Sequence, residues 1–155
     1  MADLLRDAVE GGASLGFLLP LGRAEAESYW GSVVDAMHAE RRLLLVALAG
    51  QGVIGSVQLD LETRANGSHR AEVMKLMVLR AHRRQGVGRK LMSAVRAVAR
   101  GAGRSLLLLD VRAGDPAEAL YREFGFANFG EVPRYARSPD GRLAATCFYY
   151  LDLAP

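Results

Sequence analysis

Cysteine is almost absent from this chain, since Cys147 is the only one among 155 residues. One cysteine cannot form an internal disulfide, which excludes the disulfide-rich secreted class and is typical of a protein of the reducing cytoplasm. Cys147 lies in the apolar run ATCFYYLDL, so we interpret it as a core residue rather than a nucleophile. No apolar run reaches the roughly 18 residues of a membrane span, and the acidic N-terminus does not resemble a secretory signal. We therefore expect a cytoplasmic protein without a membrane partner.

Acidic residues are absent from one basic stretch, although the chain as a whole is nearly balanced. The net charge is +3, from 20 basic and 17 acidic residues. Such a local excess of positive charge suits a compact polyanion better than a long nucleic acid, so no nucleic-acid partner is expected. The three histidines show no ligand spacing, and we predict no metal site. The cations of the stretch are Arg80, His82, Arg83, Arg84, Arg89 and Lys90.

Hydrophobic periodicity predicts a single domain over residues 1–155, of mixed α/β (α+β) class with one mixed sheet. Apolar runs predict strands over 43–48, 52–62, 71–79 and 105–111, and in the segments NFGEV and ATCFYYLDL. Strand 71–79 is apolar on both faces apart from Glu72 and Lys75, which places it centrally in the sheet. Helices are predicted over 3–10, over 23–39, from 86 to 101, and after Asp115 and Pro116. Helix 23–39 is expected to face the core with Tyr29, Val33, Ala36 and Met37.

Strand 71–79 runs into the basic loop, and the loop opens a helix. The first N–H groups of a helix have no intrahelical partner, and its dipole places positive charge there. Gly86 and Gly88 lack a Cβ, so a ligand can approach the main chain closely. Arg83, Arg84 and Arg89 can add charge-assisted hydrogen bonds to the same anion. The loop is therefore interpreted as a phosphate site, and a pyrophosphate suits it best.

Two other nucleotide-binding motifs were weighed against this stretch. A P-loop is excluded because the chain has no GxxxxGK[ST] sequence. A dinucleotide fingerprint shares Gly86 and Gly88, with Asp110 about twenty residues further on. Its third glycine would fall on Leu91, and the loop follows a hairpin instead of opening a βαβ unit. The dinucleotide interpretation is the weaker one.

The loop RRQGVG, residues 83–88, between a strand and a helix resembles the acyl-CoA pyrophosphate loop of the GCN5-related N-acetyltransferases (GNAT superfamily). The segment EALYREFGF resembles the second signature of that superfamily, and the predicted elements from Leu43 to Leu153 follow its topology. The resemblance implies a GNAT fold and acetyl-CoA as cosubstrate. It also implies which residues contact the coenzyme: Met77, Val78, Leu79, Arg83, Arg84, Gln85, Gly86, Val87, Gly88, Arg89, Lys90 and Tyr121.

Within the superfamily, segments such as RAEVMKLMVL and EVPRYARSPDGRL resemble the tabtoxin resistance acetyltransferases. Proteins of this kind usually begin with a β-strand, whereas Met1 lies almost directly at the first predicted helix. We therefore expect the first edge strand to be missing. An uncovered sheet edge invites pairing, and a second copy of the chain in a homodimer is one way to cover it.

Acetyl transfer to an amine needs a group that accepts the amine proton, because an amine near pH 7 is mostly protonated. Glu72, at the start of strand 71–79, and Asp110, at the end of strand 105–111, are the candidate carboxylates, and both face one cleft if their strands are neighbours. The resemblance implies that these acids bind and deprotonate the substrate ammonium. Because direct proton transfer from an amine to an ordinary carboxylate is strongly uphill, we expect a relay through water. It places Tyr121 beside the leaving thiolate as proton donor. Backbone N–H groups from Met77 to Leu79 would polarise the acetyl carbonyl.

Each of these residues also has a purely structural interpretation. Glu72 could pair with Arg70, Asp110 could cap a turn, and Tyr121 could be a core residue. The favoured function is N-acetyl transfer from acetyl-CoA to a small-molecule amine, with a toxin- or antibiotic-like amine suggested by the resemblance. The alternatives are a protein N-terminal or lysine acetyltransferase and a non-catalytic acyl-CoA-binding module.

Overall fold

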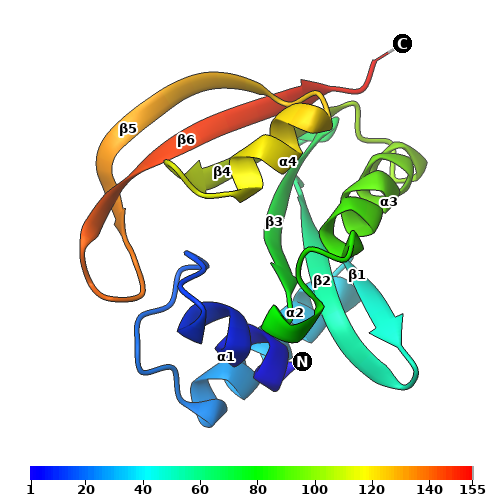
Figure 1. The fold of residues 1–155 in the computed structure, drawn as a ribbon. Helices are drawn as coiled ribbons and strands as arrows, with labels where there is room; N and C mark the ends of the chain where they lie inside the picture. Colours follow the sequence, from blue (N-terminus) through cyan, green and yellow to red (C-terminus); the bar gives the residue numbers. More distant parts are fainter. Residues whose placement is uncertain (155) are drawn as a thin grey trace.

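The computed structural model describes residues 1–154 and confirms the predicted mixed α/β class (Figure 1). Short turns of 3-10 helix precede and follow β3, at Ala65–Gly67 and Arg80–His82. The helices of this part of the chain are α1 (Ala2–Glu10), α2 (Arg23–His38), α3 (Val87–Gly101) and α4 (Ala117–Glu123). Its strands are β1 (Arg42–Ala49), β2 (Gly52–Leu61), β3 (Arg70–Val78), β4 (Leu106–Arg112), β5 (Ala127–Arg137) and β6 (Leu143–Asp152).

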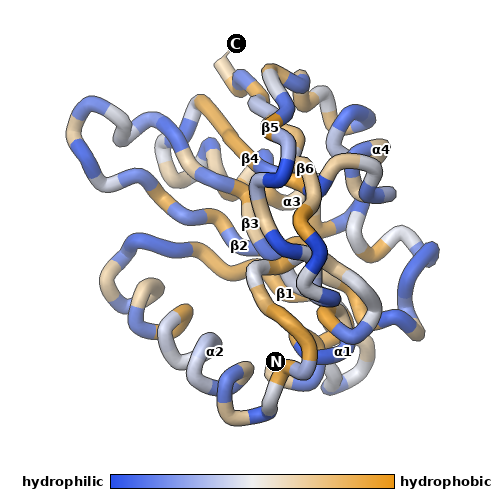
Figure 2. Tube along the Cα trace, turned by 90° about the vertical axis from the view of Figure 1, so that its left-hand side faces the viewer, coloured by the Kyte–Doolittle hydropathy of each residue, from blue (hydrophilic) through white to orange (hydrophobic). Residues whose placement is uncertain are grey.

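The strands form one sheet in the order β1-β2-β3-β4-β6-β5, so β3 is central as predicted. One face carries the larger core, in which α3 and α4 pack against the strands. The other face carries a second core that joins α1 and α2 to β1, β2 and β3 and contains no described residue of β4, β5 or β6. In Figure 2, apolar residues gather along the strands in the middle of the molecule. Half of the second face is therefore left without helices packed on it.

Neighbouring strands β3 and β4 are parallel, and they stay paired over only three residue pairs, from Arg70 with Leu106 to Glu72 with Leu108. Beyond Glu72 the two strands separate, and Figure 1 shows β4 turning away from β3. An extra residue interrupts the pairing of β3 with β2 at this point, because Ser56 faces Met77 while Gln58 faces Met74. Lys75, in this bulge, has a φ of 54°. β-bulges bend and twist a strand locally, which fits the divergence of β3 from β4.

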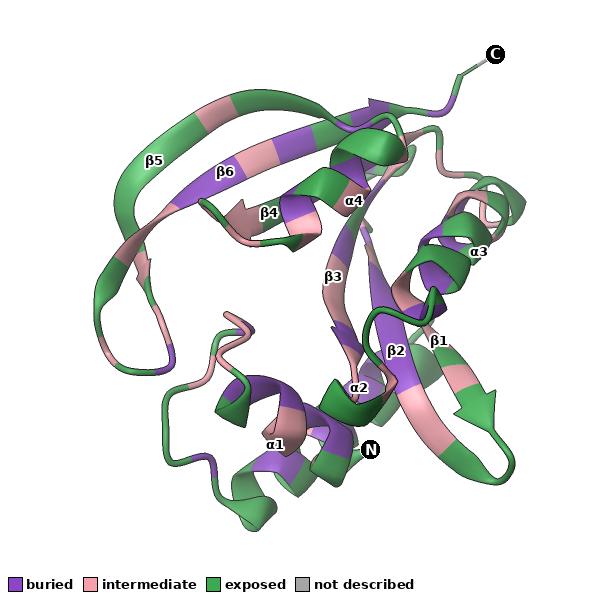
Figure 3. Ribbon diagram, in the orientation of Figure 1, coloured by how far each residue is buried: buried purple, intermediate pink, exposed green. Residues whose placement is uncertain are grey.

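No strand precedes α1 in the described residues, and β1 is an edge strand of the sheet. β5 is the other edge strand, and it runs to Arg137, well beyond the predicted segment NFGEV. Pro133 and Arg134, which has a φ of 57°, lie in an interruption of its pairing with β6. Proline is tolerated at sheet edges and bulges, and so it did not end this strand. Figure 3 shows how exposed β5 is along its length.

Two details of the helices differ from prediction. α2 buries Ala26, Trp30, Val33 and Ala36, whereas Met37 is exposed, so the expected position of Met37 in the core is wrong. The buried residues of α2 begin at Ala26, which is nearer the N-terminus of the helix than predicted. α4 begins at Ala117, after Pro116, rather than at the proline itself. Asp115 still provides a partner for a main-chain N–H group at the start of this helix, because its Oδ1 accepts a hydrogen bond from the Ala117 N–H at 3.0 Å.

Replacement of Gly55 by alanine tests how closely α3 packs on the sheet. A Cβ at Gly55 would lie 3.0 Å from the Met77 carbonyl oxygen and 3.1 Å from Val87 Cγ1 in the first turn of α3. Because backbone and a buried side chain must move, we expect Gly55→Ala to lower the free energy of unfolding by about 1–3 kcal/mol in urea denaturation. The matched control is Gly31→Ala in α2, where the added Cβ meets no atom within 4 Å. That change should raise stability by roughly 0.5–1 kcal/mol. Equal effects of the two substitutions would contradict the packing described here.

Candidate active site

The predicted phosphate loop places six consecutive main-chain N–H groups at the start of α3. None of the N–H groups from Arg84 to Arg89 donates a hydrogen bond within residues 1–154, whereas the N–H of Lys90 donates to the Gly86 carbonyl at 3.0 Å. Arg84 and Gly86 have φ values of 62° and 79°. Left-handed residues in such a turn aim successive N–H groups into one concavity, a geometry that binds anions. The loop therefore has the donors of a phosphate site.

Space for a ligand remains above the two glycines of the loop. A Cβ built on Gly86 meets nothing within 4 Å, and one built on Gly88 has its nearest contact with Leu120 at 3.6 Å. The packing of the protein therefore does not by itself require glycine at Gly88. A ligand group could therefore approach the main chain closely at this position.

The cations of the basic stretch differ in whether they have partners within the protein. Arg80 is paired with Asp7 and Glu10 of α1, and Arg89 is paired with Glu123 of α4. These acids are remote in sequence, so the local count of charges missed them. Arg83 donates from Nε to the Val78 carbonyl at 3.1 Å. Within the described residues, the side chains of the remaining three, His82, Arg84 and Lys90, have no hydrogen-bond or ion-pair partner.

The opening between β3 and β4 begins beyond Glu72 and continues to the end of β3, which runs into this loop. The Leu79 N–H donates to the Ile54 carbonyl of β2 at 2.9 Å, so the expectation of a free Leu79 N–H is not met. Along a strand, successive residues direct their N–H and C=O groups to opposite sides. Val78 therefore directs its N–H away from β2 and towards the opening, as its carbonyl contact with Arg83 also indicates. The N–H group of Met77, like that of Leu79, is directed towards β2. Of the three predicted main-chain donors, Val78 is the one placed at the opening.

Glu72 and Asp110 lie on the same face of the sheet, opposite the α3 core. Their neighbours in sequence, Val73 and Leu109, point into that core, so the alternation of strand residues directs both carboxylates to the other face. Arg70 pairs with Glu62 at 2.9 Å and forms no ion pair with Glu72, so the structural interpretation of Glu72 as a partner of Arg70 is wrong. Neither Glu72 nor Asp110 has an ion-pair partner among residues 1–154.

Burial raises the pKa of the Glu72 carboxyl above its ordinary value of 4.5, and the nearby charges of Asp110 and Asp60 raise it further. The Glu72 side chain reaches solvent, but the protein around the concave face removes part of its hydration. Lys75 belongs to the same group of charges. Burial lowers its pKa, while Asp110 and Glu72 act in the opposite direction. Its Nζ donates to the Leu15 carbonyl at 2.7 Å, which joins this face to the loop between α1 and α2.

Tyr121 is 7% exposed in α4 and packs edge-on against Phe126, with ring centroids 6.0 Å apart. Burial raises the pKa of its phenol far above the usual value, and the charges of Asp115 and Asp110 add to the shift. Tyr121 therefore keeps its proton at neutral pH. The ring lies in the core between α3, α4 and the sheet.

A cavity of about 540 Å³ lies between the loop after α1, the end of β4 and the turn between β5 and β6, and none of the predicted site residues lines it. It is bridged by a hydrogen bond from the Leu19 N–H, in the loop between α1 and α2, to the Pro139 carbonyl in the turn between β5 and β6, at 2.9 Å. Arg112 lines it, two residues beyond Asp110 on the same sheet face. No local sequence signal marks this contact, because it joins segments 120 residues apart and depends on the tertiary arrangement. The full lining is Gly11, Gly12, Leu19, Arg112, Ser138, Pro139, Asp140, Arg142, Leu143 and Ala144.

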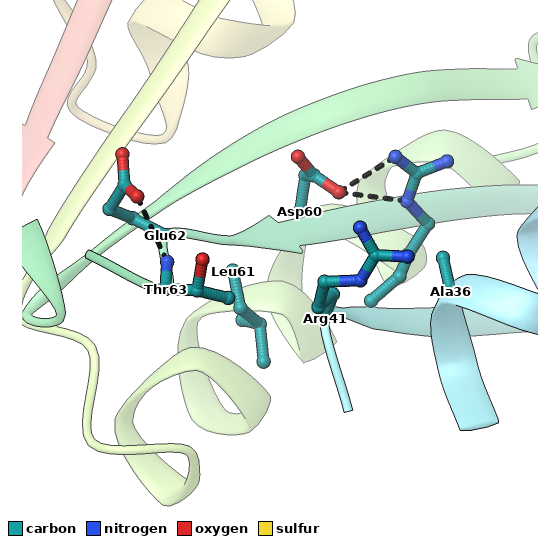
Figure 4. Close-up of a pocket in the computed structure, with 7 residues that line it drawn as sticks. Ala36, Arg41, Asp60, Leu61, Glu62 and Thr63 are labelled. Carbon is teal, nitrogen blue, oxygen red and sulfur yellow. Dashed lines mark hydrogen bonds and ion pairs between the residues drawn. The ribbon is translucent and has the colours of Figure 1, made fainter. Parts of the chain in front are cut away.

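A smaller hollow of about 240 Å³ lies near the start of β1 and the end of β2 (Figure 4). Arg42 contacts Asp60 in it through two nitrogens, at 2.7 and 2.9 Å. Arg41 and Glu62 complete its polar wall. None of the predicted site residues lines this hollow.

Comparison with known proteins identifies the family. The model of the acetyltransferase (GNAT) family matches residues 16–126. The chain belongs to the GNAT family. A curated relative from Azospirillum brasilense, an uncharacterized N-acetyltransferase in the hisH-hisA intergenic region, is 33% identical over 114 residues. That match spans 72% of this chain and 66% of the relative, slightly less than two thirds of the relative's length.

Solved structures share the GNAT fold over nearly the whole chain. A ribosomal-protein-alanine N-acetyltransferase from Brucella melitensis has a TM-score of 0.81 at 22% identity, covering 98% of this chain and 91% of its own. An N-acetyltransferase from Staphylococcus aureus Mu50 has a TM-score of 0.83 at 17% identity, covering 99% and 90%. An acetyltransferase-like protein from Salmonella typhimurium, solved with acetyl-CoA, has a TM-score of 0.81 at 20% identity, covering 99% and 87%. At these identities the likeness concerns the fold alone.

A charge reversal at Arg84 tests the loop as a GNAT coenzyme site. Arg84→Glu should weaken the binding of coenzyme A roughly ten- to a hundredfold in low salt, because it replaces an attractive charge with a repulsive one beside the N–H groups. The loss should shrink as salt is added, since exposed charges are screened. Isothermal titration calorimetry measures both effects. The control is Arg41→Glu in the remote hollow, which should leave the affinity within about twofold. Equal affinities for the two variants would count against the loop.

Proposed function

We propose that this GNAT protein transfers an acetyl group from acetyl-CoA to the amine of a small molecule. The observation that carries the proposal is the opening between β3 and β4. Beside it lie the free N–H groups from Arg84 to Arg89, and on the sheet face next to it lie the two carboxylates without ion-pair partners, Glu72 and Asp110. A coenzyme and an acceptor amine could meet there.

The donor side rests on residues of the loop and of β3. Acetyl-CoA supplies the reactive thioester when it is bound. The N–H groups from Arg84 to Arg89 and the charge of Arg84 would hold its diphosphate. The Val78 N–H would polarise the acetyl carbonyl from the edge of β3. Holding amine and thioester together in one opening would supply much of the rate enhancement.

The acceptor side rests on the two carboxylates and on Tyr121. Glu72 and Asp110 would bind the ammonium form of the acceptor and take up its proton through water. The raised pKa of Glu72 makes it a better proton acceptor than an ordinary carboxylate. The buried, protonated Tyr121 would donate a proton to the departing thiolate. Two carboxylates favour a cationic acceptor over an anionic one.

The size of the neighbouring cavity favours a small acceptor over a protein chain. Its volume of about 540 Å³ is within the usual range for a small-molecule site, and a hydrogen bond from the Leu19 N–H to the Pro139 carbonyl joins two segments that line it. A protein N-terminus or lysine entering from this side would have to pass that contact. A module that only bound acyl-CoA would gain nothing from two unpaired carboxylates. The likeness to tabtoxin resistance acetyltransferases makes a toxin- or antibiotic-like amine a first choice for testing.

Cellular location and assembly also remain proposals. No helix among residues 1–154 combines the length and the hydropathy needed to cross a membrane. A cytoplasmic location rests on the single buried Cys147. A homodimer rests on edge strand β1, where Val46 and Leu48 are exposed.

Removal of the phenol hydroxyl tests the role of Tyr121. Tyr121→Phe keeps the ring and its contact with Phe126, and no hydrogen bond to the hydroxyl is lost within the described residues. We expect turnover to fall by roughly 10² or more while coenzyme affinity stays nearly unchanged, as for the loss of a proton donor. Thiol release from acetyl-CoA across a panel of amines, amino acids and aminoglycosides measures turnover. Equal turnover in the two proteins would remove Tyr121 from the reaction.

The pH profile tests whether Glu72 must be ionised. Because its pKa lies above 4.5, kcat/KM should fall as the pH is lowered through that raised pKa. Glu72→Gln should remove this acid limb and lower the rate. Asp60→Asn should shift the limb to lower pH, since it removes a negative charge and leaves Arg42 unpaired. If the acid limb of the kcat/KM profile stays at the same pH in both variants, it reports the ionisation of another group.

A further inference from the structure

Four aromatic side chains form a cluster beside the proposed acceptor carboxylates. Phe148 of β6 lies with its ring centroid 5.1 Å from that of Tyr135 and 6.1 Å from that of Phe129. Phe129 is also 6.1 Å from Tyr150. Phe129, Tyr135 and Tyr150 are 59%, 54% and 41% exposed. We call Phe129, Tyr135, Phe148 and Tyr150 the aromatic shelf.

Strand pairing places this shelf next to the carboxylates. Asp110 is directly opposite Phe148 across the β4–β6 pair, and Leu108 is opposite Tyr150. Leu108 is in turn opposite Glu72 across the β3–β4 pair. Residues directly opposite each other project from the same face of a sheet, with Cβ atoms about 5 Å apart. Glu72, Asp110 and the shelf therefore form one continuous surface.

The carboxylates of this surface outnumber the cations near them. Arg42 is paired with Asp60 and Arg112 with Asp115, whereas the charge of Lys75, whose Nζ donates to the neutral Leu15 carbonyl, acts on both Glu72 and Asp110. Glu72 and Asp110 have no ion-pair partner within residues 1–154. The surface thus offers two carboxylates flanked by exposed rings, and aromatic faces attract cations as carboxylates do.

We propose that the aromatic shelf is the specificity-determining surface of the acceptor site, and that it selects organic ammonium compounds with a flat apolar skeleton. This inference rests on the proposed function. The ammonium group would lie between Glu72 and Asp110, and the carbon skeleton would lie on Phe148, Tyr135 and their neighbours. Polyhydroxylated amines such as aminoglycosides would gain little from the rings, which offer mainly apolar area.

A second copy of the chain is the competing occupant of the shelf. A dimer packed through these rings would also remove Asp110 from water, because it is the direct neighbour of Phe148. Burying a carboxylate without an ion-pair partner costs several kcal/mol, and the single charge of Lys75 is shared between Asp110 and Glu72. A cationic ligand covers the rings and neutralises the carboxylates together.

Binding of benzyltrimethylammonium tests the proposal without any chemical step. The quaternary nitrogen cannot be acetylated, so the result is independent of whether the protein releases thiol from acetyl-CoA. We expect benzyltrimethylammonium to bind roughly tenfold more tightly than either tetramethylammonium, which lacks the ring, or benzyl alcohol, which lacks the charge. Ligand-observed NMR titration or calorimetry gives the three affinities.

Variants assign the binding to the shelf. Tyr135→Ala and Phe129→Ala should each weaken benzyltrimethylammonium at least about fivefold, because each removes a ring from the cluster. Tyr135→Phe keeps the ring and should bind within about twofold of the unmodified protein. The control is Leu48→Ala, which removes an exposed apolar side chain from edge strand β1 and should leave the affinity for benzyltrimethylammonium unchanged. Asp110→Asn should weaken the cation but not benzyl alcohol.

Three results would overturn the proposal. Benzyltrimethylammonium could bind no more tightly than tetramethylammonium, or its affinity could be unchanged in both alanine variants. Sedimentation equilibrium could also show a dimer that Tyr135→Ala dissociates, which would assign the shelf to a second copy. Failure of thiol release with every amine would count against the proposed transfer while leaving the binding result in force.

Discussion

The early end of the pairing between β3 and β4 is the constraint on which the site depends. Each strand is held by its other neighbour, because β3 pairs with β2 from Ala71 to Val78 and β4 pairs with β6 from Leu106 to Arg112. The sheet therefore consists of two halves that meet only at Arg70–Glu72. The opening between them exposes the edge of β3, extends from Glu72 to the loop before α3 and leaves Glu72 and Asp110 accessible. A fully paired sheet would leave no room for a thioester at this point.

The site combines two kinds of polar group, arginines that are held in ion pairs and N–H groups and carboxylates that have no partner among the described residues. Arg80, Arg89, Arg42 and Arg112 are all engaged by carboxylates, and these ion pairs fix helices and strands around the opening. Within residues 1–154, the N–H groups from Arg84 to Arg89 donate no hydrogen bond, and Glu72 and Asp110 form no ion pair. In the proposed function, these groups and the aromatic shelf would provide an anion site at the helix, a reaction site at the opening, and a cation and apolar site on the sheet.

Much of this arrangement was predictable because it depends on local signals. The change of period at Gly86, the glycines of the loop and the position of Tyr121 in EALYREFGF are properties of short segments. Contacts between remote segments were not predictable: the pairing of Arg80 with Asp7, the bridge from Leu19 to Pro139 and the use of the Leu79 N–H by β2. The aromatic shelf was missed for a related reason. Its four rings come from two strands, and one of these, β5, was predicted too short because Pro133 and Arg134 interrupt its pattern.

The most direct test of the account is the response of the loop amides to coenzyme A. In an NMR titration of the isotope-labelled protein, the N–H signals from Arg84 to Arg89 should shift strongly and together as coenzyme A is added, because these groups lack partners and would gain phosphate oxygens. Signals of residues around Arg41 should stay in place. Saturable binding of coenzyme A that leaves the signals from Arg84 to Arg89 unmoved would contradict the account.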